Sequence, residues 1–169
     1  KSEGIPIFGV CLGAQLLSKM LGGNVEPSGG YQFGLRKIWI TPEGSHDPVF
    51  SKIRIPLVPT LHGECFTIPP GGVELANGYM LGKHGSYRKI SMAFKHGHSY
   101  GFQFEPQLTL KELEVWNQEL MADYRKMGPL FKPSEEADIN LREFVSYAPF
   151  YESQSREMLI AFLKNAGLA

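Results

Sequence analysis

A cysteine between two glycines is the most chemically informative feature of the chain. Cys11 follows a short apolar run, residues 5–10, and precedes a segment with helical spacing that ends in a pair of glycines. Gly9 and Gly13 stand two residues before and two residues after it, and small residues there leave room for a sharp turn from a strand into a helix. A side chain at such a turn is raised from the edge of a sheet. The pattern therefore predicts a thiol nucleophile at Cys11.

The predicted helix after the cysteine affects the chemistry of the thiol. Residues 12–21 form that helix, and its free N–H groups and positive dipole end point at the sulfur. Both effects lower the pKa of a thiol and favour the thiolate. The alternative is a buried cysteine that only packs at the end of a strand. We favour the nucleophile because the strand, the G-x-C-x-G pattern and the helix occur together.

The segment around Cys11 resembles the nucleophile segment of class I glutamine amidotransferases, in which a cysteine attacks the side-chain amide of glutamine and releases ammonia. Further matches follow in chain order, and the last two resemble segments of the GMP-synthase-like branch: GVCLGAQ at 9–15, LGGNV at 21–25, LHGECFTIP at 61–69 and YGFQF at 100–104. The resemblance covers about residues 4–125. It implies an α/β fold of the flavodoxin-like type, an open three-layer arrangement with a mixed or parallel sheet and helices on both faces.

The resemblance also assigns site residues. It makes Cys11 the nucleophile and places substrate-binding residues in two segments: Leu12, Gly13 and Gln15 after the cysteine, and His62, Gly63 and Glu64 in a loop near the substrate. The backbone N–H of Leu12 is then one of two donors to the oxyanion. For Glu64, a solvated loop acid and a site role are equally compatible with the sequence.

The chain departs from the family at the other two triad positions. Where the family has His-Pro-Glu, this chain has Glu105-Pro106-Gln107. A histidine takes the thiol proton and returns one to the leaving ammonia, whereas a glutamate titrates near about 4.3 and is a weak base. A carboxylate beside Cys11 also raises the pKa of the thiol, and Gln107 cannot orient a cation. We expect Cys11, Glu105 and Gln107 to occupy the catalytic positions and the activity to be impaired.

Two other histidines bear on this substitution. The resemblance brings His62 near the substrate, which makes it a candidate replacement base. His98 begins a predicted strand that ends at Phe104, so it lies about 20 Å from position 105 along that strand. His98 is therefore a poor candidate.

Three functions remain open on the sequence. The first is an active amidotransferase that hydrolyses glutamine and passes ammonia to a synthetase subunit or domain. The second is a catalytically silent homologue that keeps the site for binding or regulation. The third is another cysteine hydrolase that acts on an amide or γ-glutamyl bond. The replaced triad positions favour the impaired or silent forms.

Composition limits the partners and the location. The chain has 169 residues, of which 43% are hydrophobic, and 17 basic residues balance 17 acidic ones, so we expect no nucleic-acid partner. It holds no apolar run of 18 residues, so we expect no membrane span. The two cysteines have no metal-ligand spacing, and we expect neither a metal nor a cofactor. A nucleophilic thiol suits a reducing compartment such as the cytoplasm.

The sequence further predicts one domain over residues 1–169, in which 109–169 are a helical C-terminal extension. The resemblance also implies an N-terminal part, before Lys1, with earlier strands and a glycine loop that supplies the second oxyanion donor. Residues 24–34 are predicted as a loop, residues 42–47 as a turn and residues 50–53 as a helical turn. Strands are expected at 35–41, 55–61, 73–76, 90–95 and 100–104, and helices at 109–127, with a Thr109–Glu112 capping box, at 134–144, with Ser134 as its cap, and at 151–165.

Overall fold

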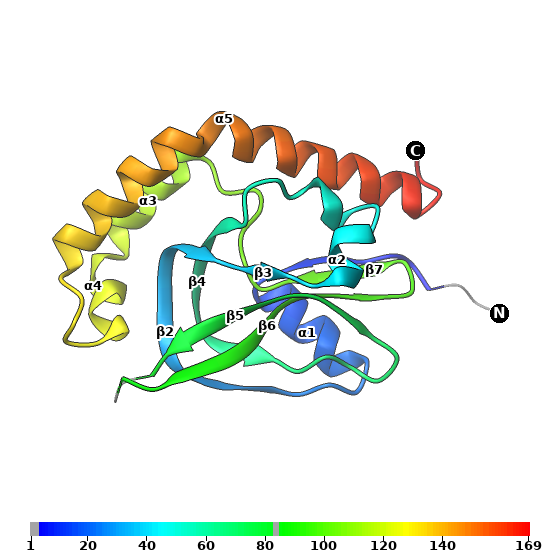
Figure 1. The fold of residues 1–169 in the computed structure, drawn as a ribbon, viewed down its shortest axis with the longest axis horizontal. Helices are drawn as coiled ribbons and strands as arrows, with labels where there is room; N and C mark the ends of the chain where they lie inside the picture. Colours follow the sequence, from blue (N-terminus) through cyan, green and yellow to red (C-terminus); the bar gives the residue numbers. More distant parts are fainter. Residues whose placement is uncertain (1–3, 83–84) are drawn as a thin grey trace.

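Two sheets carry the fold in the computed structural model, which describes residues 4–82 and 85–169. A five-stranded sheet has the order β1-β7-β6-β5-β3, and β2 pairs with β4 in a second sheet (Figure 1). The strands are β1 (Phe8–Val10), β2 (Val25–Lys37), β3 (Trp39–Ile40), β4 (Leu57–Phe66), β5 (Val73–Leu81), β6 (Tyr87–His96) and β7 (Ser99–Phe102). The helices are α1 (Leu12–Met20), α2 (Pro42–His46), η1 (Phe50–Lys52), α3 (Leu110–Glu119), α4 (Met121–Tyr124), η2 (Arg125–Met127) and α5 (Pro133–Asn165).

The pairing of β1 with β7 sets the position of the nucleophile turn. These strands are parallel, with Gly9 opposite Gly101 and Val10 opposite Phe102, whereas the other pairs in this sheet are antiparallel. The backbone N–H of Cys11 continues the ladder and donates to the Phe102 carbonyl at 2.8 Å. The residues that follow Cys11 and Phe102 therefore leave the sheet at the same edge, where ligands gather in open α/β sheets.

Helices cover both faces of the mixed sheet, as the α/β expectation requires (Figure 1). On the α1 side, Ala14 and Leu17 pack with Phe66 and Phe94 in one apolar cluster. The C-terminal half of α5 packs on the other side, where Phe162 meets the ring of Tyr100 edge-on with centroids 6.1 Å apart. Burial of these large side chains is the main stabilising contribution to such a core.

The expected loop at 24–34 is wrong, because residues 25–34 belong to β2. Long-range pairing with β4 outweighs the turn propensity of the glycines, and an irregularity in the register between Pro27 and Gln32 accommodates them. Gly29 lies in this irregularity with a φ of +88°, which favours glycine. Residues 62–64, expected in a loop after a strand at 55–61, belong to the partner strand β4 instead.

Several element boundaries also differ from the expectation. Residues 42–46 are a short helix capped by Thr41, and the strands expected at 73–76 and 90–95 are longer. The Thr109–Glu112 capping box is confirmed, but its helix ends at Glu119 and is followed by α4 and η2.

The two helices expected at the C-terminus are one helix, α5, which begins after Lys132 rather than at a Ser134 cap. Pro149 lies inside it, although proline removes a helical hydrogen bond. Buried residues continue at helical spacing on both sides of Pro149, and Phe144 contacts Tyr151 with ring centroids 5.0 Å apart. Tertiary packing of this apolar face therefore outweighs the local cost of the proline.

A buried asparagine joins α5 to β2 and α4. The Oδ1 of Asn140 accepts from the Leu35 backbone N–H at 3.0 Å, and its Nδ2 donates to the Tyr124 hydroxyl at 3.2 Å. The Tyr124 ring in turn stacks near Phe33, with centroids 4.0 Å apart. Asn140 is 1% exposed, so these polar groups have no access to solvent as an alternative partner.

We therefore predict that Asn140→Ala lowers the free energy of unfolding by about 1–3 kcal/mol, because it leaves the buried Leu35 N–H without a partner and removes one of the two hydrogen bonds of the Tyr124 hydroxyl. Chemical denaturation measures this difference. Asp138→Ala, at an exposed position of the same helix, is the control and should change stability by less than about 0.5 kcal/mol. Equal effects of the two substitutions would contradict the role of Asn140.

Candidate active site

Cys11 lies at a strained turn between β1 and α1. Its φ of 47° and ψ of −108° make it the single non-glycine residue with positive φ in residues 4–82 and 85–169, and such strain is concentrated at functional sites. Any Cβ on Gly9 would lie 2.9 Å from the backbone carbonyl of Gly13, so position 9 requires glycine. A Cβ on Gly13 would meet nothing within 4 Å. The expectation that the turn requires a small residue is confirmed at position 9 and is wrong at position 13, where a side chain would meet no other atoms.

Three segments surround the thiol. The Cys11 Sγ donates to the Leu61 carbonyl of β4 at 3.6 Å, and the Gln103 side-chain amide donates to Sγ at 3.8 Å. Gln15 links the same segments, because its Nε2 donates to the Gln103 Oε1 at 3.3 Å and to the Glu64 carbonyl at 3.4 Å. Gln15 is thus buried in a side-chain network that joins α1, β4 and the end of β7.

Glu105 and Gln107 lie together at the thiol. Glu105 is fixed by its backbone N–H, which donates to the Pro59 carbonyl at 2.9 Å, and its carboxylate accepts from the Gln107 Nε2 at 2.6 Å. The charge of this carboxylate raises the pKa of the Cys11 thiol, so the two groups are close enough to interact. The three side chains expected at the catalytic positions therefore lie near one another, and an amide orients the carboxylate.

The pKa of the thiol is raised rather than lowered. Burial, followed by the charge of Glu105 and its hydrogen bond, raises the pKa of Cys11 to about 12, and the backbone N–H of Leu12 and the Gln103 amide lower it less. The expectation that Cys11 is a thiolate is therefore wrong, because desolvation and a like charge raise its pKa by more than the donors at the start of α1 lower it. At neutral pH the sulfur carries its proton.

His62, Gly63 and Glu64 lie on β4 and not in a loop. The His62 ring is 5% exposed, and both of its nitrogens have partners: Nδ1 contacts the Glu64 carbonyl at 2.8 Å and Nε2 contacts the Gln32 Oε1 at 3.0 Å. Burial lowers the pKa of His62 to about 4. Because its nitrogens are committed to these contacts, His62 does not provide the free imidazole that a replacement base requires.

The thiol opens into a cleft of ≈ 530 Å³. Pro27, Tyr31 and Leu61 line it in addition to residues expected from the sequence, which are Cys11, Leu12, Gln15, His62, Gly63 and Glu64. The sequence carries one further signal for this site, since Gln103 lies in the YGFQF segment. Pro27 and Tyr31 carry none, because they reach the cleft through the irregular pairing of β2 with β4.

Metal-binding and membrane-spanning features are absent from the described part of the chain. Residues 4–82 and 85–169 contain no cluster of three or more histidine, cysteine or acidic side chains arranged to hold a metal ion. Within the same ranges, no helix has both the length and the apolar character needed to cross a membrane. Cys11 and Cys65 are both free thiols.

Comparison with known proteins identifies the family. The family model described as glutamine amidotransferase class-I matches residues 1–121, which is more than half of the chain. The chain therefore belongs to the class I glutamine amidotransferase family.

Curated relatives are named GMP synthase [glutamine-hydrolyzing]. The protein of Chlorobaculum tepidum is 28% identical over 127 residues, which cover 73% of this chain and 23% of the relative. A protein of Thermus thermophilus is 31% identical over 108 residues, covering 63% of this chain and 20% of the relative. The chain thus spans about a fifth to a quarter of the length of the curated relatives it matches.

Solved structures share the fold. A glutamine amido transferase from Methylobacillus flagellatus superposes with a TM-score of 0.71 at 20% identity, over 95% of this chain and 63% of that one. A glutamine amidotransferase from Thermotoga maritima gives 0.66 at 20% identity, over 92% and 63%. These likenesses confirm the flavodoxin-like α/β fold.

The electrostatics of the thiol lead to a test by alkylation. We predict that Cys11 reacts slowly with iodoacetamide at pH 7.4 and that Glu105→Gln speeds the reaction, because removal of the charge lowers the thiol pKa, with about tenfold more thiolate for each unit. Peptide mapping by mass spectrometry measures the rate at Cys11 separately from Cys65. Glu64→Gln is the matched control, and the idea fails if both variants react at the wild-type rate.

Proposed function

We propose that this chain hydrolyses the side-chain amide of glutamine with Cys11 as nucleophile, and that it does so slowly at neutral pH. Membership of the amidotransferase family supports the substrate. The observation that carries the proposal is that Cys11 lines a cleft at a strained strand-to-helix turn, with the Glu105 carboxylate close enough to act on its thiol. An acid occupies the position at which the family holds the catalytic histidine.

The reaction has two stages. The thiol proton passes to the Glu105 carboxylate as Sγ attacks the amide carbon, and the backbone N–H of Leu12 donates to the oxygen that becomes negative. The C–N bond then breaks, and the nitrogen leaves as ammonia with the proton returned by Glu105. Water attacks the thioester, which releases glutamate and restores the thiol.

The proposed rate limitation is the first proton transfer. A carboxylic acid titrates near about 4, whereas the Cys11 thiol titrates at about 12, so a carboxylate takes this proton against a large difference in acidity. A histidine, with a pKa near about 6.5, is a stronger base for the same step. Gln107 supports the carboxylate through its amide N–H and adds no second acid or base.

We also propose that any released ammonia passes to a synthetase subunit or domain and that the protein works in a reducing compartment, the cytoplasm. The synthetase partner is supported by relatives named GMP synthase [glutamine-hydrolyzing]. The compartment is supported by two free cysteines. A second candidate is a silent binding module, which the raised pKa of Cys11 favours; it predicts no ammonia release that depends on Cys11.

Restoring the family residues tests the assignment of the triad. We predict that Glu105→His combined with Gln107→Glu raises ammonia release from glutamine by at least about 100-fold, since a positioned base contributes about 10²–10⁴-fold. A coupled glutamate dehydrogenase assay measures the ammonia. Cys11→Ala in the same background is the control and should abolish the gain. No gain in a folded double variant would refute the triad assignment.

The pH profile provides a second test, on the unmodified protein. Because the thiol is protonated below about pH 12, the thiolate fraction rises about tenfold per pH unit across the neutral range. We predict that Cys11-dependent hydrolysis of glutamine rises steadily from about pH 7 to about pH 9. A plateau that begins near neutral pH would instead indicate a thiol with a low pKa.

A further inference from the structure

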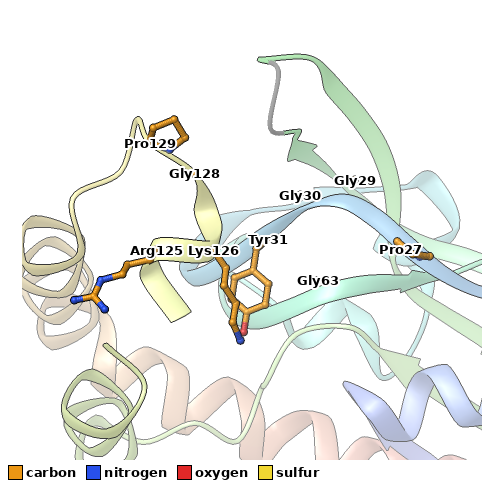
Figure 2. A pocket seen from close by; sticks show the side chains of 9 residues that line it. All are labelled: Pro27, Gly29, Gly30, Tyr31, Gly63, Arg125, Lys126, Gly128 and Pro129. Atoms are coloured by element: carbon orange, nitrogen blue, oxygen red, sulfur yellow. The ribbon is translucent and has the colours of Figure 1, made fainter. Parts of the chain in front are cut away.

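A second cavity adjoins the thiol cleft. It has a volume of ≈ 640 Å³, and it shares Pro27, Tyr31 and Gly63 with the cleft (Figure 2). Its opposite wall is formed by residues 125–129, which follow the amidotransferase match at 1–121. The two cavities are therefore neighbours across Tyr31, and the part of the chain beyond the family match forms one wall of the outer one.

Tyr31 is held at this boundary from the C-terminal part of the chain. Its hydroxyl donates to the Asp123 Oδ2 at 3.0 Å, and the Lys126 Nζ lies 5.1 Å from the centre of its ring. Figure 2 shows the Lys126 side chain alongside Tyr31, whereas the Arg125 side chain points away from it. Lys126 also pairs with Asp123 at 2.5 Å, so the three side chains form one cluster.

Gly63 lets the ring lie close to β4. A Cβ at position 63 would come within 2.9 Å of the Tyr31 ring, and contacts that short do not occur for real side chains. Tyr31 and Cys11 line the same cleft. A molecule bound at Sγ thus has Tyr31 at its side and the second cavity beyond.

The volumes of the thiol cleft and the second cavity indicate the size of the substrate. Each cavity lies within the range of about 300–1,000 Å³ that accommodates a drug-sized ligand, so the two together have room for a ligand larger than a single amino acid. The second cavity is lined by backbone at Gly29, Gly30 and Gly128, by the faces of Tyr31 and two prolines, and by the basic residues Arg125 and Lys126. Such a lining suits a flat group that carries a carboxylate, which a γ-glutamyl dipeptide does.

We propose that the site binds γ-glutamyl amides whose amide nitrogen carries a further group, with the glutamyl part at Cys11 and that group beyond Tyr31 in the second cavity. This inference rests on the thiol site proposed above. The chemistry is the same acyl transfer: the C–N bond breaks, the leaving nitrogen departs as an amine instead of ammonia, and water releases glutamate from the thioester. γ-Glutamyl dipeptides are the simplest members of this class.

Calorimetric binding of γ-glutamylphenylalanine and of L-glutamine tests the inference without turnover when it is done on a Cys11→Ser variant. We expect the dipeptide to bind at least about tenfold more tightly than glutamine, because its ring adds buried apolar area. Pro129→Trp places a large side chain in the wall of the second cavity and should remove this advantage while glutamine binding is unchanged.

Two control variants distinguish the effect of filling the second cavity from the effects of losing the proline or of adding a tryptophan elsewhere. Pro129→Ala removes the proline without filling the cavity, and Leu130→Trp adds the same bulk at a side chain that is 78% exposed; both should keep the preference for the dipeptide. If Pro129→Trp does not fold, Lys126→Trp replaces it. Equal affinity for both ligands in the parent, or equal weakening of both by the bulky variant, overturns the inference.

The outcome is distinguishable from that of the proposed hydrolysis. If the dipeptide is preferred but neither compound is cleaved by the wild-type protein, the binding inference holds and the proposed hydrolysis fails. If glutamine is cleaved in a Cys11-dependent manner and the dipeptide binds no more tightly than glutamine, the proposed hydrolysis holds and the second cavity does not bind the substrate.

Discussion

The backbone of Cys11 is the constraint on which the site depends. Its positive φ is maintained because the N–H of Cys11 continues the β1–β7 ladder to Phe102 while the next residue already begins α1. The turn closes only because Gly9 has no side chain to meet the Gly13 carbonyl. The same ladder carries the chain after Phe102 toward the thiol, so Glu105 comes to lie beside Cys11. Local strain and long-range pairing thus produce one arrangement.

Glu105 and Gln107, the residues at the two replaced positions, are electrostatically compatible with each other. If position 107 kept the glutamate of the family while Glu105 replaced the histidine, two carboxylates would lie within hydrogen-bond distance. Like charges at that range repel each other. Gln107 removes this repulsion and donates to the Glu105 carboxylate at 2.6 Å. The remaining charge on Glu105 raises the pKa of the Cys11 thiol, which burial already raises. The donors at the start of α1 do not reverse this shift, because burial and the charge of Glu105 raise the pKa by more than the N–H groups lower it.

The C-terminal helices contribute to the site as well as to the core. Asn140 of α5 bonds to β2 and to Tyr124, and Asp123, next to that tyrosine, accepts from Tyr31 at the rim of the thiol cleft. A continuous set of contacts therefore connects α5 to the cleft wall through α4. Through these contacts Tyr31 of β2, which lies 20 positions after Cys11 in the sequence, shapes the cleft beside the thiol.

Features that depend on short spacing were determined by the sequence alone. The nucleophile turn at Cys11, the Thr109 capping box, the α/β class and the unusual residues at 105 and 107 all follow from neighbouring residues or a local motif. Features that depend on distant partners were decided only by the tertiary structure. Residues 25–37 are a strand because β4 pairs with them, and α5 continues through Pro149 because its apolar face is covered. The pKa of the thiol depends on both: the sequence indicated that Glu105 would raise it, but the largest cause is the burial of the sulfur, which only the tertiary structure decided.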